Sequence, residues 1–257
     1  MPHFSGVALV IGAGSSYGKA VTRLLIENGC MRLIVGDTDE TELANLQAEC
    51  RALDRPTLRI ISKKCDTRVA EDLEYIVELG VAEFGAINYC ANCERLNYIQ
   101  GTTTDISPEE FNRAGDTWQK GIWLAMRAQV RQFNTQRDED DTAGTSIVNI
   151  TAAQGLASDG GFPSYCAAAH GIVGMSRATA MDYLKKGIRI NCVCPGPTEN
   201  PGTYDRAESG SLPQAPIGRY IAAEEVAHAV VFLLGEGASG ITGIELPVDG
   251  GWSLYHH

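Results

Sequence analysis

A glycine-rich segment near the N-terminus has the composition of a nucleotide-binding turn. Residues 11–18 read Ile-Gly-Ala-Gly-Ser-Ser-Tyr-Gly and lie between an apolar run at 7–11 and an amphipathic stretch at 16–28. Glycines at such a junction allow a tight turn and bring a pyrophosphate close to the N-terminus of the following helix. The dinucleotide contacts expected from this turn are Gly12, Ser15, Ser16, Tyr17 and Gly18.

Asp37 follows the next apolar run, 32–36, and stands 19 residues after Gly18. A carboxylate at this place can accept hydrogen bonds from both hydroxyls of an adenosine ribose, and it repels a 2′-phosphate. The alternative is that Asp37 only caps the helix that follows it. The spacing favours the ribose role, so we expect NAD(H) rather than NADP(H) if a dinucleotide binds.

Apolar runs alternate with amphipathic stretches along the whole chain. Strands are expected at 7–11, 32–36, 58–64, 86–90, 146–151, 188–194 and 244–248, and helices at 16–28, 40–53, 69–84, 108–133, 163–184 and 224–234. The alternation predicts an α/β fold, with one Rossmann-type doubly wound parallel sheet over residues 1–257 in a three-layer α/β/α arrangement. Ligands of such sheets bind outside the carboxyl ends of the strands. Segment 197–220, which holds several Pro and Gly, is expected to form a substrate loop or lid.

Composition excludes several classes of protein. The net charge of −11 argues against nucleic acid and membrane surfaces as partners. No apolar run approaches the ~20 residues that span a bilayer, and the N-terminus lacks a basic signal segment, so we expect a cytoplasmic protein. The eight cysteines are expected to be reduced and mostly buried. Cys90 and Cys93 have the spacing of a metal pair, but no second pair follows, and we expect no metal site.

Several motifs resemble those of the short-chain dehydrogenase/reductase family. Residues 11–18 resemble TGxxxGxG, 191–196 resemble NxVxPG, and 241–243 with 248–251 resemble the C-terminal TG and VDGG motifs. The resemblance runs essentially end to end and implies a single-domain enzyme, a homodimer or homotetramer, with a small-molecule substrate. It also implies cofactor contacts by Asp66 at the adenine, by Cys90, Ala91 and Asn92 in place of the family's NNAG, and by Pro195, Gly196 and Thr198. Asn92 would replace a glycine there, because asparagine tolerates a left-handed backbone.

The family's catalytic residues are Asn, Ser, Tyr and Lys, and the resemblance finds only the tyrosine, Tyr165. The positions of Asn, Ser and Lys hold Trp118, Ala152 and Ala169, which we expect to line the pocket. A tyrosine without the lysine has a pKa of about 10, which makes it a poor base for alcohol oxidation but still a proton donor. Asp159 and Cys166 are weaker candidates for proton transfer beside it.

The depleted catalytic set favours a redox-neutral enzyme of isomerase, cyclase or dehydratase type. It would act on a small, largely apolar substrate, with Tyr165 as proton donor and acceptor. One alternative is an NAD(H)-dependent carbonyl reductase with a reduced proton-transfer set, for which Asp37 and the glycine-rich turn argue. Another is a catalytically silent protein that binds a ligand, or a partner through helices 108–133 and 163–184.

Overall fold

Seven strands pair in parallel to form one sheet in the computed structural model, which describes residues 4–94, 100–136, 144–198 and 214–255. The strands are β1 (Ala8–Ile11), β2 (Arg32–Asp37), β3 (Arg59–Lys64), β4 (Tyr89–Asn92), β5 (Thr145–Ile150), β6 (Ile188–Pro195) and β7 (Glu245–Val248). Their order across the sheet is β3-β2-β1-β4-β5-β6-β7. The direction of the order reverses between β1 and β4, where doubly wound sheets bind ligands.

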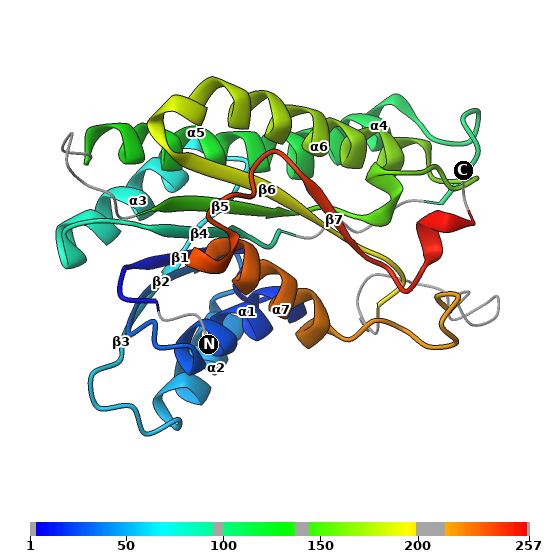
Figure 1. Ribbon diagram of the computed structural model, residues 1–257. Coiled ribbons are helices and arrows are strands. Elements are labelled where there is room, and N and C mark those ends of the chain that lie inside the picture. The colour runs from blue at the N-terminus through cyan, green and yellow to red at the C-terminus, as the bar shows by residue number, and fades with distance from the viewer. Residues whose placement is uncertain (1–3, 95–99, 137–143, 199–213, 256–257) are drawn as a thin grey trace.

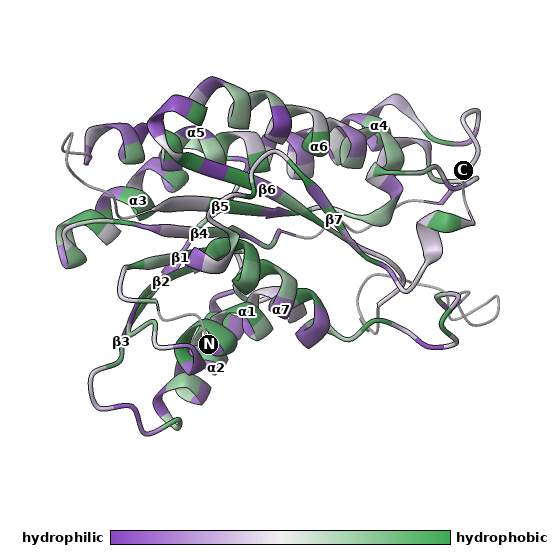
Figure 2. Ribbon diagram, in the orientation of Figure 1, coloured by the Kyte–Doolittle hydropathy of each residue, from purple (hydrophilic) through white to green (hydrophobic). Residues whose placement is uncertain are grey.

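Helices cover both faces of the sheet, as the sequence predicts (Figure 1). On one face lie α3 (Ala70–Phe84), α5 (Lys120–Thr135) and α6 (Pro163–Tyr183), and on the other α1 (Ser16–Glu27), α2 (Glu40–Arg51) and α7 (Ala223–Leu234). A buried apolar cluster fills each interface between helices and sheet. Figure 2 shows the apolar character of the central strands, which is expected where a parallel sheet is covered on both faces.

The stretch expected as one helix over 108–133 contains an irregular turn. Helix α4 (Pro108–Ala114) begins at a capping box, in which the Ser107 hydroxyl and the Glu110 carboxylate accept each other's backbone N–H. Residues Gly115–Gln119 then form a π-helical turn before α5 begins. Such turns are rare and often occur at functional sites. This one carries Trp118.

Strand β4 lies two to three residues later than the sequence suggests. The expected strand was 86–90, whereas the observed one is Tyr89–Asn92. Asparagine is typical of turns, yet Asn92 is the last residue of β4 and is only 1% exposed. Its amide is instead satisfied inside the protein, because Nδ2 donates to Asn149 Oδ1 at 2.8 Å and Oδ1 accepts from Gln129 Nε2 at 2.7 Å.

This buried polar network extends from the sheet into the helices above it. Asn149 Nδ2 donates to Ser176 Oγ at 2.9 Å, so β4, β5, α5 and α6 are linked by side-chain hydrogen bonds. The network lies at the carboxyl ends of β4 and β5, and it holds these two strand ends in register beneath the loops that follow them.

No helix in the described ranges is long and apolar enough to cross a membrane.

Replacing Asn149 with Ala should destabilise the protein by about 3 kcal/mol, because it removes the buried hydrogen bonds that the Asn149 amide forms with Asn92 and Ser176. Urea unfolding measures the change in free energy. The matched control is Asn134→Ala, which removes an exposed acceptor of Lys186 Nζ and should change stability by less than about 1 kcal/mol. Equal small losses in both variants would show that the network does not hold the strand ends.

Candidate active site

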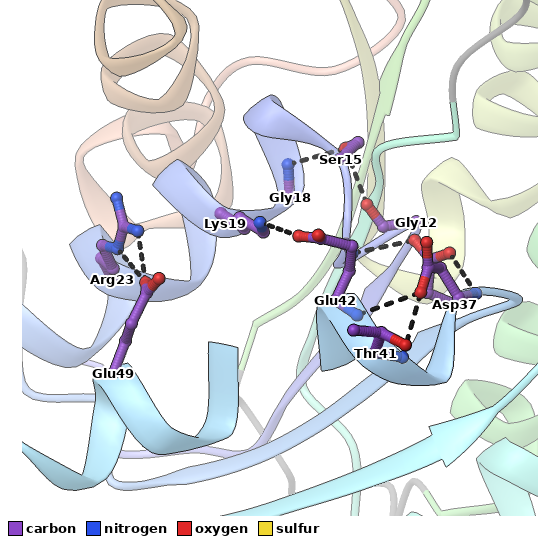
Figure 3. Close-up of polar contacts among 11 residues, drawn as sticks. Gly12, Ser15, Gly18, Lys19, Arg23, Asp37, Thr41, Glu42 and Glu49 are labelled. Atoms are coloured by element: carbon purple, nitrogen blue, oxygen red, sulfur yellow. Dashed lines mark hydrogen bonds and ion pairs between the residues drawn. The ribbon is translucent and has the colours of Figure 1, made fainter. Parts of the chain in front are cut away.

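The glycine-rich turn joins β1 to α1 with no room for additional side chains. A Cβ at Gly18 would collide with the Gly12 carbonyl oxygen, and one at Gly12 would lie 2.7 Å from the Cys93 carbonyl. Ser15 caps α1, since its hydroxyl donates to Gly12 O at 2.7 Å and accepts from the Gly18 N–H at 3.0 Å (Figure 3). The turn therefore keeps the N-terminus of α1 open toward the switch point of the sheet.

Asp37 is positioned by the same turn. Its Oδ2 accepts the Gly14 N–H at 2.8 Å, and its Oδ1 accepts the Asp39 N–H at 2.9 Å. Helix α2 is capped by Asp39, whose carboxylate accepts the N–H groups of Thr41 and Glu42 (Figure 3). Asp37 is thus not the helix cap, and each of its oxygens keeps a lone pair for a further donor.

A cavity of about 460 Å³ opens at the carboxyl ends of strands β1, β2 and β4. Its described lining is Gly12, Gly14, Ser15, Asp37, Thr38, Asp39, Glu42, Glu94, Arg113 and Thr117. The Ser16 hydroxyl in the same turn is buried and has no hydrogen-bond partner within the described residues. A donor without an acceptor beside an open helix N-terminus suits a phosphate oxygen, and Asp37 suits a ribose, so these residues fit a dinucleotide.

The end of β4 differs in position from the expected strand, and cofactor contacts by Cys90, Ala91 and Asn92 stay a prediction. Cys90, Ala91 and Asn92 are buried inside the strand, and none of them lines the cavity. Asn92 does not adopt the left-handed backbone expected of it, because Asp54 is the one described non-glycine residue with positive φ. The residues that face the glycine-rich turn are Cys93 and Glu94. The sequence prediction missed both because it ended the strand too early.

The end of β6 contacts α1 and the segment after β7. Pro195 is the last residue of β6, and Gly196 packs against Asp249, whose Cα would lie 2.7 Å from a Cβ at that position. The hydroxyls of Thr198 and Tyr17 are 2.7 Å apart, which ties the loop after β6 to α1. Most of the expected lid, residues 199–213, lies outside the described residues.

The Asp66 carboxylate forms an ion pair with Arg68. Its Oδ2 lies 2.6 Å from Arg68 Nη2, and this guanidinium holds the pKa of Asp66 below its usual range. Asp66 is not part of the described cavity lining. Its contact with an adenine stays a prediction.

Tyr165 lies in the first turn of α6 and packs against Trp118 from the π-helical turn. The two ring centroids are 5.0 Å apart and the ring planes are tilted by 31°. Trp118 is 2% exposed, and its indole Nε1 has no hydrogen-bond partner in the described part of the chain. Tyr165 is half-buried.

Ala152 and Ala169 are buried in the same apolar cluster as Trp118. Tyr165 packs against that cluster, which spans one face of the sheet, and the role of these four residues in a pocket stays a prediction. The Thr151 hydroxyl donates to the Ala169 carbonyl at 3.2 Å, which turns it away from substrate chemistry. The polar side chains available for proton transfer around Tyr165 are therefore few.

The thiols near the site are not activated. All eight cysteines are free and buried, and burial raises the pKa of the Cys166 thiol. Cys166 Sγ lies 3.9 Å from the Asp159 carbonyl oxygen. The described residues hold no group of three or more His, Cys, Asp or Glu side chains that could bind a metal ion. The proton-transfer role of Asp159 stays a prediction.

A family model described as enoyl-(acyl carrier protein) reductase matches residues 12–253. The chain belongs to the short-chain dehydrogenase/reductase family. A short-chain dehydrogenase of Aspergillus ruber, fogB, is 32% identical over 267 residues, with 97% of each chain covered. Cyclohexanol dehydrogenase of Acinetobacter sp. strain SE19 is 32% identical over 250 residues, with 96% of this chain and 94% of the relative covered.

Among solved structures, an actinorhodin polyketide ketoreductase with NADPH matches with a TM-score of 0.86 at 27% identity, covering 97% of each chain. The names of these three relatives are those of dehydrogenases and a reductase. They give no support to the redox-neutral interpretation that the sequence favoured.

The buried thiols should react slowly in the folded protein. Burial raises the pKa of Cys65 to about 12 and that of Cys30 to about 11. Because the thiolate is the reactive form, iodoacetamide at pH 8 should alkylate all eight thiols at least about 100-fold more slowly in native protein than in urea. Mass spectrometry of the peptides resolves each site. Rapid native alkylation of Cys166 alone would identify an activated nucleophile and contradict this description.

Proposed function

We propose that this chain is an NAD(H)-dependent carbonyl reductase that acts on a small, largely apolar ketone. The observation that carries the proposal is the cavity at the glycine-rich turn, which Gly12, Ser15 and the Asp37 carboxylate line at the N-terminus of α1. The buried Ser16 hydroxyl, in the first turn of α1, has no hydrogen-bond partner within the described residues. The names of the relatives support an oxidoreductase, and that of cyclohexanol dehydrogenase supports cyclic ketones as the first substrates to test.

In this proposal the nucleotide half of the site does the binding. The N-terminus of α1 and the Ser16 hydroxyl receive the pyrophosphate, and Asp37 accepts the hydroxyls of the adenosine ribose. Arg113 is the one cation of the described lining, whose other charged side chains are acidic. It therefore offsets part of the repulsion between these carboxylates and phosphate. When bound, NADH would supply the hydride for the carbonyl carbon.

Tyr165 supplies the proton. Its hydroxyl donates to the carbonyl oxygen as the carbon is reduced, which completes the alcohol, and water returns a proton to the tyrosine. One missing oxyanion donor typically lowers the rate 10²–10³-fold, and such losses within one catalytic unit are not additive. With alanine at positions 152 and 169, the enzyme should be slow and should favour reduction over alcohol oxidation.

We also propose that the chain assembles as a homodimer or homotetramer. Large apolar side chains stay exposed on the helices of one face, as at Phe111, Trp123 and Met181. Exposed apolar side chains of this kind support a surface that a second copy covers.

Cofactor preference tests the role of Asp37. The wild-type protein should bind NADH at least about tenfold more tightly than NADPH, because the Asp37 carboxylate repels a 2′-phosphate. Asp37→Ala should remove most of this preference, as measured by calorimetric titration. Asp39→Ala is the matched control, since it also removes one negative charge but takes away the cap of α2 instead. A preference lost equally in both variants would contradict a specific ribose contact.

Tyr165→Phe tests the proton donor. Its rate of NADH oxidation with cyclohexanone should fall at least about 100-fold, because the phenyl ring keeps the packing on Trp118 but has no hydroxyl. The dissociation constant for NADH should change less than twofold. Tyr183→Phe, at the other end of α6, is the control and should keep the wild-type rate. Unchanged turnover in Tyr165→Phe would remove Tyr165 from the reaction.

A further inference from the structure

We propose that Trp118 is a second hydrogen-bond donor of the active site, and that its indole Nε1–H binds an oxygen atom of the molecule held beside Tyr165. The inference rests on the proposed function and names a residue that takes over part of the work of the missing polar side chains.

The first observation is that the donor is buried without an acceptor. Trp118 is 2% exposed, and no acceptor for its Nε1–H occurs within the described residues. A buried tryptophan usually finds a partner for this group, and folding loses free energy when it does not. Few such groups remain in native proteins, and a binding role is one of the explanations for those that do.

The second observation is the position of the indole. Thr117, the residue before it, lines the cofactor cavity, and the Tyr165 ring lies 5.0 Å from the Trp118 ring. Trp118 thus follows a residue of the cavity lining in sequence and contacts the Tyr165 ring in space. It is carried by the π-helical turn Gly115–Gln119, whose wider winding changes the direction of side chains relative to an α-helix.

The third observation is the apolar character of the surroundings. Ala152 and Ala169 belong to the same buried cluster, and methyl groups donate no hydrogen bonds. The Thr151 hydroxyl donates its hydrogen bond to the Ala169 carbonyl. An oxygen atom that binds beside Tyr165 would thus meet apolar side chains and an unused N–H, and a preorganised donor is most effective in such surroundings.

Indole N–H is a donor only, so its role is electrostatic. It stabilises negative charge that develops on a carbonyl oxygen while Tyr165 delivers the proton. The other acceptor to which the same N–H can donate is a ribose hydroxyl oxygen of the cofactor. Both acceptors share one chemistry, an uncharged oxygen, and the experiment separates them.

Nuclear magnetic resonance of protein with ¹⁵N-labelled tryptophan reports the donor directly. The chain has three tryptophans, and the spectrum of Trp118→Phe identifies the indole signal of Trp118. If that variant does not fold, Trp123→Phe and Trp252→Phe assign the signal by elimination. One sample receives saturating NADH, and a second receives NAD⁺ with cyclohexanone, a pair that cannot react. Calorimetry on the same samples measures nucleotide binding.

A downfield shift of the Trp118 indole proton in either sample supports the inference. A shift with NADH alone identifies the cofactor as the acceptor, and a shift only with NAD⁺ and cyclohexanone identifies the ketone. Binding heat without a Trp118 shift in either sample overturns the inference and leaves the proposed function standing. Absence of binding heat overturns the proposed function, and the inference falls with it.

A variant comparison adds a kinetic readout. Trp118→Phe keeps an aromatic ring against Tyr165 but removes the N–H donor together with one ring of the indole, so kcat/KM for cyclohexanone should fall at least tenfold. Tyr75→Phe is the control, because it removes a donor from a side chain that is 49% exposed on α3, and it should keep the wild-type value. Equal kcat/KM in Trp118→Phe and wild type would show that the ring serves packing alone and would overturn the inference.

Discussion

The close contact between the first turn of α1 and the end of β1 is the constraint on which the site depends. Gly18 must lie against the Gly12 carbonyl, where no side chain fits, and Ser15 bridges the two through its hydroxyl. The same hydroxyl lies 3.1 Å from the Cys93 carbonyl oxygen, so β4 joins the contact. The turn also presents the Gly14 N–H that orients Asp37. One local arrangement thus shapes the cavity and aims its main carboxylate.

The two halves of the proposed active site keep the family's motifs to different extents. The nucleotide half keeps a glycine-rich turn, an acidic residue after β2 and an open helix N-terminus, which are the features that bind a dinucleotide. In the other half, Tyr165 remains, but its neighbours are the buried Trp118 and two alanines. Proton donation needs one group that is protonated at neutral pH, whereas proton abstraction from an alcohol needs an activated base. This difference is why carbonyl reduction suits the remaining residues better than alcohol oxidation.

Most of the fold could be predicted from the sequence, because covered parallel strands are short apolar runs and the helices between them are amphipathic. The expected strand 188–194 and the expected helix 163–184 each differ from β6 and α6 by one residue. The expected strand 86–90 ends two residues before β4 does, because the buried Asn92 is of a residue type that is typical of turns. Its partners Gln129 and Asn149 are 37 and 57 residues away, so local pattern cannot reveal that the amide is satisfied. For the same reason, the sequence did not predict that Cys93 and Glu94 lie against the glycine-rich turn. The partnerless indole of Trp118 depends on three-dimensional packing, and sequence alone contains no signal for it.

Isotope transfer tests the central claim, that this site reduces a carbonyl with a hydride from NADH. The protein is incubated with cyclohexanone and NADH carrying deuterium at both C4 positions, and the product is analysed by mass spectrometry. The account predicts cyclohexanol with one deuterium on the carbinol carbon, formed in step with loss of NADH absorbance. Alcohol without deuterium would contradict it. So would a failure to oxidise NADH with any cyclic ketone, which would point instead to a redox-neutral or silent protein.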